Sequence, residues 1–204
     1  MSRTLFYYSL RMGTDGRREQ ILTAALGCFL ENGVTGTSIA EIRQRSGAST
    51  GSIYHFFRSK EAIAVALYLE GLSGWTAATL NVPSKAGAGE AIACIVSDAV
   101  DWGLANAPLM QFMDENRFLL VRVAGLEEAT SILLAARERG ERILELLALG
   151  GELQVREWEL AQPILLGPMQ AWLQLHRQGQ AVASAGEAKS ALTAAARRAL
   201  LLEP

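Results

Sequence analysis

Small hydroxyl side chains, a phenol and an imidazole gather between residues 49 and 55, where their spacing suggests chemistry. The segment contains Ser49, Thr50, Ser52, Tyr54 and His55. Each of these side chains can form hydrogen bonds with phosphate oxygens or with the edges of bases. Helices that enter a DNA groove contact bases with their N-terminal residues, and those residues are small and polar here. We therefore expect this segment to read DNA.

A hydrolase is the alternative interpretation of the same segment. Residues 47–51, GASTG, match the G-x-S-x-G pattern, and Ser49, Asp114 and His176 follow the serine, acid, histidine order of an α/β-hydrolase. That motif works on a turn from a strand to a helix above a parallel sheet. Here an amphipathic helix precedes it and no strand pattern is found, so we expect no catalytic residue.

A short helix and a tight turn are predicted just before this segment. Ser38 and Glu41 have the spacing of a capping box, and Ile39 and Ile42 give the helix one apolar stripe. Gly47 supplies the permissive backbone that a sharp turn between two crossing helices requires. The helix is expected to end near residue 45.

The second short helix and the start of a third complete the predicted unit. Ser49 can cap the second helix, and Ile53 and Phe57 lie one turn apart and are expected to point inward. Ser59 and Lys60 then open the third helix, where backbone N–H groups and an ammonium suit a phosphate. Such a unit buries little alone, so it needs helices on both sides.

These residues resemble the N-terminal domain of tetracycline-repressor-like (TetR) regulators. The matching runs are GTSI at 36–39, SGAS at 46–49, GSIYHFF at 51–57 and SKEA at 59–62, within a resemblance that covers about residues 15 to 70. Arg43 and Ser46 depart from the alanines common in the family, and Ala48 from valine. The resemblance implies DNA contacts by Ser49, Thr50, Tyr54, His55 and Lys60, to which we add Arg43 as a phosphate contact.

The resemblance also implies what the rest of the chain does. A helical body is expected to bind a small-molecule effector that releases a repressor from its DNA, and the C-terminal helices are expected to form a homodimer on a near-palindromic double-stranded operator. Two alternatives stay open: a DNA-binding regulator without an effector, and a helical protein that has this fold but no longer binds DNA. Aromatic, methionine and polar side chains of the body are the candidate effector contacts: Trp102, Met110, Met113, Asp114, Phe118, Trp158, Trp172 and His176.

The expected fold is all-α. We divide the chain into a flexible arm at 1–14, the helix-turn-helix domain at 15–60, a connecting helix and loop at 61–80, and a helical effector-binding and dimerisation domain at 81–204. Gly71 and Gly74 are predicted to end the connecting helix. Pro163 and Pro168 are predicted to kink or split a later helix. Alanines recur at every fourth place in the last helix, at 191, 195 and 199.

Composition excludes several other classes of protein. The 204 residues carry a net charge of −2, but the first 70 hold 8 basic and 6 acidic side chains, which fits a protein that offers DNA one face. Cys28 and Cys94, and the two histidines, are too scattered for a disulfide framework or a zinc site, and no cofactor loop is complete. No apolar run approaches the roughly 20 residues of a membrane helix, so a cytoplasmic location is expected.

Overall fold

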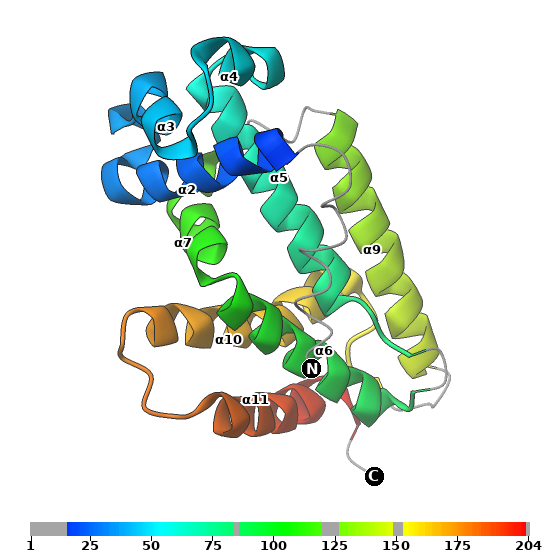
Figure 1. Ribbon diagram of the computed structural model, residues 1–204. Helices are drawn as coiled ribbons and strands as arrows, with labels where there is room; N and C mark the ends of the chain where they lie inside the picture. Colours follow the sequence, from blue (N-terminus) through cyan, green and yellow to red (C-terminus); the bar gives the residue numbers. More distant parts are fainter. Residues whose placement is uncertain (1–15, 84–85, 120–126, 149–152, 203–204) are drawn as a thin grey trace. The chain divides into compact units, whose positions relative to one another are not determined.

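The computed structural model describes residues 16–83, 86–119, 127–148 and 153–202, and most of them are helical (Figure 1). In chain order the helices are α2 (Gly16–Gly36), α3 (Ile39–Ser46), α4 (Thr50–Phe56), α5 (Lys60–Thr79), α6 (Ala88–Ala105), α7 (Ala107–Glu115), α9 (Glu127–Ala148), α10 (Trp158–Arg177) and α11 (Ala185–Leu200). Within these described ranges the extended pairing is one antiparallel bridge, between Leu153 and Leu201. The all-α prediction is confirmed.

The chain forms two compact units. The first comprises Met1–Leu72 and Asn106–Ala129, and the second comprises Ser73–Ala105 and Thr130–Pro204. Helix α5 contributes its first part to one unit and its last part to the other. Helix α7 belongs to the first unit, although we had assigned everything after residue 80 to the body. The segment at 49–55 therefore shares its compact unit with a helix from the middle of the chain.

The first unit packs α2 against α3, α4 and α7. On α2 the positions at helical spacing, including Ile21, Ala25 and Phe29, are fully or almost fully buried. The ring of Phe29 stacks on that of Phe112, with ring centroids 5.9 Å apart. Because α7 supplies Phe112, it closes the apolar side of α2 that the short helices α3 and α4 leave uncovered.

Helix α5 does not end at Gly71 or Gly74, where we predicted its end. It continues through Gly71 and Gly74 to Thr79. A Cβ at Gly71 would collide with Met113 Sδ, and a Cβ at Gly74 would lie 2.9 Å from the ring of Trp102. The prediction of a helix end was wrong because both glycines make room for large side chains of helices that pack on α5.

The second unit packs α10 and α11 against α6 (Figure 1). One arc of α6 at helical spacing is buried, including Ile92, Val96 and Ala99. Leu173 of α10 fills the place where Gly103 has no side chain. Helix α10 continues through both of its prolines, so it is not split. No helix among the described residues is long and apolar enough to cross a bilayer.

Polar contacts tie α11 to α6 at two points. Lys189 Nζ donates to Asp101 Oδ1 at 2.6 Å, and the Asp101 side chain stays 47% exposed. Arg197 donates to the carbonyl of Gly89 from Nε at 3.1 Å and from Nη2 at 2.7 Å. Asp101 therefore lies on a solvated surface, where it pairs with a lysine of the neighbouring helix.

Candidate nucleic-acid interface

The predicted turn between α3 and α4 is present. The Ser38 backbone N–H donates to Glu41 Oε2 at 2.6 Å, and the Glu41 backbone N–H donates to Ser38 Oγ at 3.2 Å. This capping box is confirmed, and it lowers the pKa of Glu41, mainly through the Ser38 hydroxyl and then through its backbone N–H. Gly47 ends α3 at φ 65° and ψ 9°, a left-handed conformation that favours glycine.

Helix α4 has one buried side and one exposed side. Ser49 Oγ accepts a hydrogen bond from the Ser52 backbone N–H at 3.0 Å and so caps the helix. Ile53 is fully buried and Phe57 is 5% exposed, as predicted. With this side fixed to the core, Tyr54 is 52% exposed and His55 is exposed on the opposite side. The residues expected to contact DNA on α4 therefore face outward.

The structure brings most of the sequence-predicted DNA contacts onto α4. Ser49, Thr50, Tyr54 and His55 belong to this helix and its cap, and all four are exposed. The Ser49 hydroxyl accepts the capping hydrogen bond but can still donate its proton to a phosphate. Arg43 is exposed near the end of α3.

Lys60, at the start of α5, has a structural contact that the sequence did not reveal. Its Nζ donates to the carbonyl of Thr35 at 2.6 Å and to the carbonyl of Thr37 at 2.8 Å. These carbonyls lie where α2 leads into α3. The ammonium therefore connects the start of α5 to the segment that precedes α3. An ammonium has three N–H donors, which leaves one for a phosphate.

Two arginines also form contacts between helices of the first unit. Arg45 Nη1 donates to Glu31 Oε1 at 2.6 Å, and this contact, with one to Cys28, raises the pKa of Arg45. Arg18 Nη1 donates to Glu70 Oε1 at 2.6 Å and its guanidinium lies 5.5 Å from the centroid of the Phe57 ring. These cations fix α3 and α5 to α2.

One exposed cation near α4 escaped the sequence reasoning. Arg58 is the second residue after α4 and lies two residues before Lys60, and it is exposed. A basic residue between the two helices that carry the expected DNA contacts was the available signal. We add Arg58 to the candidate phosphate contacts.

The hydrolase interpretation does not fit this geometry. Residues 47–49 connect α3 to α4 and residues 50 and 51 begin α4, so a helix and not a strand leads into the motif. Ser49 Oγ accepts the capping hydrogen bond of α4. The strand-to-helix elbow on which a G-x-S-x-G nucleophile depends is replaced by the turn of a helix-turn-helix.

Four candidate effector contacts lie in the first unit, and they differ in burial and in the groups that they contact. Met110 is buried, and Met113 packs where Gly71 has no side chain. Asp114 Oδ1 accepts a hydrogen bond from Arg117 Nη2 at 3.4 Å, whereas Phe118 is 56% exposed.

The other four candidates lie in the second unit. The indoles of Trp102 and Trp75 meet edge to face with centroids 5.7 Å apart. Trp158 packs against Gly140, which has no side chain to obstruct it. Trp172 stacks on His176 with centroids 5.0 Å apart, so these two candidates are brought together.

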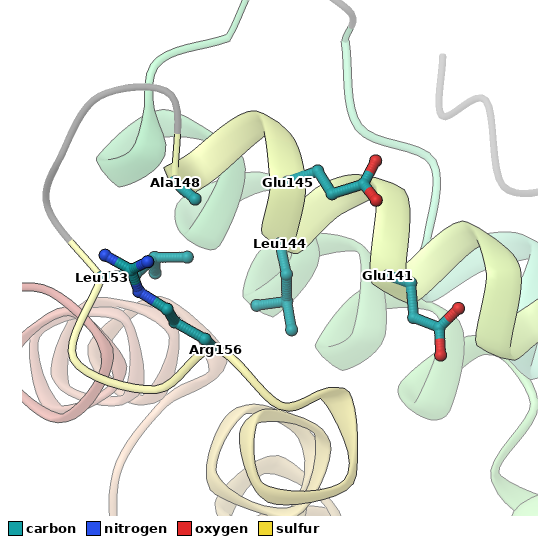
Figure 2. A pocket seen from close by; sticks show the side chains of 6 residues that line it. All are labelled: Glu141, Leu144, Glu145, Ala148, Leu153 and Arg156. Atoms are coloured by element: carbon teal, nitrogen blue, oxygen red, sulfur yellow. The ribbon is translucent and has the colours of Figure 1, made fainter.

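A hollow of about 310 Å³ opens beside α9 in the second unit (Figure 2). Glu141, Leu144, Glu145 and Ala148 line it from α9, and Leu153 and Arg156 line it from the segment before α10. None of the eight candidate effector residues belongs to this lining. Glu141 also accepts a hydrogen bond from Arg137 at 2.7 Å.

Comparison with known proteins places the helix-turn-helix in a described family. Residues 21–67 match the family model "Bacterial regulatory proteins, tetR family". A repressor of Mycobacterium tuberculosis, HTH-type transcriptional repressor Rv1474c, is 43% identical over 54 residues, which are 26% of this chain and 29% of that protein. The regulator BetI of Paraburkholderia phymatum is 30% identical over 97 residues, 47% of this chain and 50% of that protein. The chain thus spans half or less of the length of these curated relatives.

Solved structures share the fold over nearly the whole chain. A tetR-family regulatory protein from Rhodococcus RHA1 has a TM-score of 0.75 at 21% identity and covers 93% of this chain and 100% of its own. The regulator PfmR of Thermus thermophilus has a TM-score of 0.66 at 25% identity and covers 90% of this chain and 99% of its own. The likeness extends through the second unit, where the sequence carries no family motif.

Proposed function

Because this chain belongs to the tetR family of bacterial regulatory proteins, we propose that it binds double-stranded DNA sequence-specifically and represses transcription in the cytoplasm. The observation that carries the proposal is the outward face of α4. Tyr54 and His55 are exposed there, opposite Ile53, which is fully buried. A surface that presents a phenol and an imidazole on a helix fixed from behind suits a DNA groove.

The contacts on this surface divide into two chemical kinds. The Tyr54 phenol, the Arg58 guanidinium and the remaining N–H of Lys60 are suited to phosphates, which position the protein without reading sequence. Thr50 and His55 present short hydrogen-bonding groups that can reach base edges. Arg43, on α3, is suited to the phosphate backbone beside the groove.

A homodimer is proposed because α10 and α11 each expose small or apolar side chains. Leu160 and Leu175 of α10 are 57% and 44% exposed. Ala191, Ala195 and Ala199, at every fourth position of α11, are also exposed. Small and apolar side chains allow helices to approach closely, so these faces suit the same faces of a second copy across a two-fold axis.

The dimer also follows from what DNA recognition requires. One recognition helix contacts only a few base pairs, which is too little for specific binding at cellular salt. Two copies on one face of the duplex would read two half-sites whose centres are about 34 Å apart, or a multiple of this distance. The proposed operator is therefore nearly palindromic.

A small-molecule effector is proposed to bind in the helical body and release the DNA. Trp172 and His176 are the candidates with most support, because their rings stack and the Trp172 Nε1–H is buried without a hydrogen-bond partner among the described residues. A buried unpaired donor is uncommon and suits a ligand acceptor. The effector acts only through its difference in affinity for the DNA-binding and released states.

The test is selection of duplexes from a random library, followed by binding measurements on the winners. The proposal predicts one enriched near-palindromic sequence that binds at least about 10³-fold more tightly than random DNA at physiological salt. A screen of metabolites by thermal shift then tests the effector, which should raise the Tm by mass action. No enriched sequence would refute the DNA-binding function, and no stabilising metabolite would favour the regulator without an effector.

A further inference from the structure

Gly51 lies at the centre of the outward face of α4. At about 100° per residue, Gly51 lies roughly 160° around the helix from the buried Ile53. Tyr54 and His55 follow three and four residues later, so they share its face. Gly51 is exposed. A surface that lies along this face of α4 would therefore meet Gly51 together with Tyr54 and His55.

The fold of the chain gives no reason for a glycine at this position. Gly47 needs its positive φ for the turn, and Gly71 makes room for Met113. Gly51 has a negative φ, and among the described residues a Cβ added there would meet only Ser49 Oγ, at 4.0 Å, which is an ordinary contact distance. Apart from proline, glycine is the residue least favourable in a helix. Alanine would therefore fit the free protein and would favour the helix.

We propose that Gly51 is the point of closest approach between α4 and DNA, where the absence of a side chain lets the helix backbone contact the floor of the groove. This inference rests on the proposed function. The proposal depends on the space that the missing side chain of Gly51 leaves on the exposed face of α4, and not on the helix dipole. The occupant is duplex DNA, because the groups on both sides of Gly51 suit phosphates and base edges.

The geometry sets the size of the effect. A side chain at residue 51 would begin with a carbon about 1.5 Å from Cα and would hold the backbone away from the duplex by a similar distance. Hydrogen bonds from Tyr54 and His55 would then exceed their range of about 2.7–3.2 Å. Tyr54 and His55 lie one turn further along the same face. They could restore these hydrogen bonds only if α4 tilted, which its buried side opposes.

The chain contains a matched control in Gly186. Both glycines are the second residue of a helix, each after a serine that caps it through its side chain. Both are exposed, and a Cβ at Gly186 would meet no atom within 4 Å in the part of the chain that the structure describes. Gly186 lies about 180° around α11 from Ala195, away from the alanine face. Alanine at either position should favour its helix to a similar degree.

The experiment compares the wild type, Gly51→Ala, Gly51→Ser and Gly186→Ala, with helical content, Tm and affinity for the duplex selected by the wild type as readouts. We expect Gly51→Ala and Gly186→Ala each to raise the Tm by about 2 °C. Gly51→Ala and Gly51→Ser should bind the duplex about tenfold or more weakly, the equivalent of losing one good hydrogen bond. Gly186→Ala should bind like the wild type.

The outcomes separate this inference from the proposed function. Wild-type affinity in a folded Gly51→Ala or Gly51→Ser protein would overturn the role of Gly51 and leave DNA binding intact. Equal weakening in Gly186→Ala would overturn it as well, because the loss would then come from helix stiffening in general. A wild type that selects no duplex would remove the proposed function, and the inference with it.

Discussion

The outward faces of α4 and α11 differ although the two helices begin alike. Each starts with a capping serine, Ser49 or Ser184, and each buries one side against its own unit. On its outer face α4 carries a phenol and an imidazole, whereas α11 carries alanines at every fourth position. In both cases the buried side packs the helix onto its unit. The exposed side then determines what the helix can bind. A polar face suits DNA, and a face of small apolar residues suits a second copy of the same helix.

The largest effect is expected from a charge in the alanine face. Ala195→Arg should place an unpaired guanidinium in the proposed seam, give monomers with unchanged helical content, and weaken operator binding by about 100-fold or more, because each half-site would then be bound alone. Light scattering and binding assays provide the readouts. Ser190→Arg, about 140° around the same helix, is the matched control and should remain dimeric. A dimeric Ala195→Arg protein with full affinity would show that the interface lies elsewhere.

A smaller effect is expected at Lys60, whose ammonium serves the fold and, as proposed, the DNA. Lys60→Ala should lower the Tm by removing the contacts to the Thr35 and Thr37 carbonyls. It should also weaken binding to all duplexes and reduce the slope of log affinity against log salt by about 1. Lys189→Ala, which breaks the contact with Asp101, should lower the Tm without affecting DNA binding. An unchanged salt slope in Lys60→Ala would show that Lys60 does not contact a phosphate and serves only the fold.

The smallest effect is expected from the two capping boxes, Ser38 with Glu41 and Ser184 with Glu187. Hydrogen bonds from the serines lower the pKa of both glutamates below the usual 4.5. The folded state therefore gains stability from each ionised carboxylate above the ordinary pKa, and loses it as the pH falls through the lowered pKa. Thermal unfolding from pH 7 to pH 3 should show that Glu41→Gln and Glu187→Gln each reduce the drop in Tm. Equal pH dependence in the wild type and both variants would contradict this account.

Local signals made the helix-turn-helix predictable. The capping box of α3, the left-handed Gly47 and the inward Ile53 each depend on neighbours a few residues away, and all three are present in the structure. The comparison with relatives agrees over the same segment. Short-range hydrogen bonds and helical spacing are sufficient here because a turn between two short helices tolerates few residue types.

Long-range packing escaped the sequence. The prediction that Gly71 and Gly74 end α5 was wrong, because nothing nearby in the sequence shows that Met113 and Trp102 fill the space beside them. The Lys60 ammonium contacts a carbonyl 25 residues earlier in the chain. In the body, a tryptophan at helical spacing packs equally well against a glycine or a ligand, so spacing alone does not distinguish core residues from effector contacts.

The most direct measurement of the central claim concerns His55, which stands on the exposed face of α4 beside Gly51. The affinities of the wild type and His55→Ala are measured on the selected operator and on every single-base variant of one half-site. If the outward face of α4 reads bases, His55→Ala should lose discrimination, worth about 1–3 kcal/mol, at one or two positions and keep it at the others. An equal loss of affinity on every sequence would contradict base reading by this face.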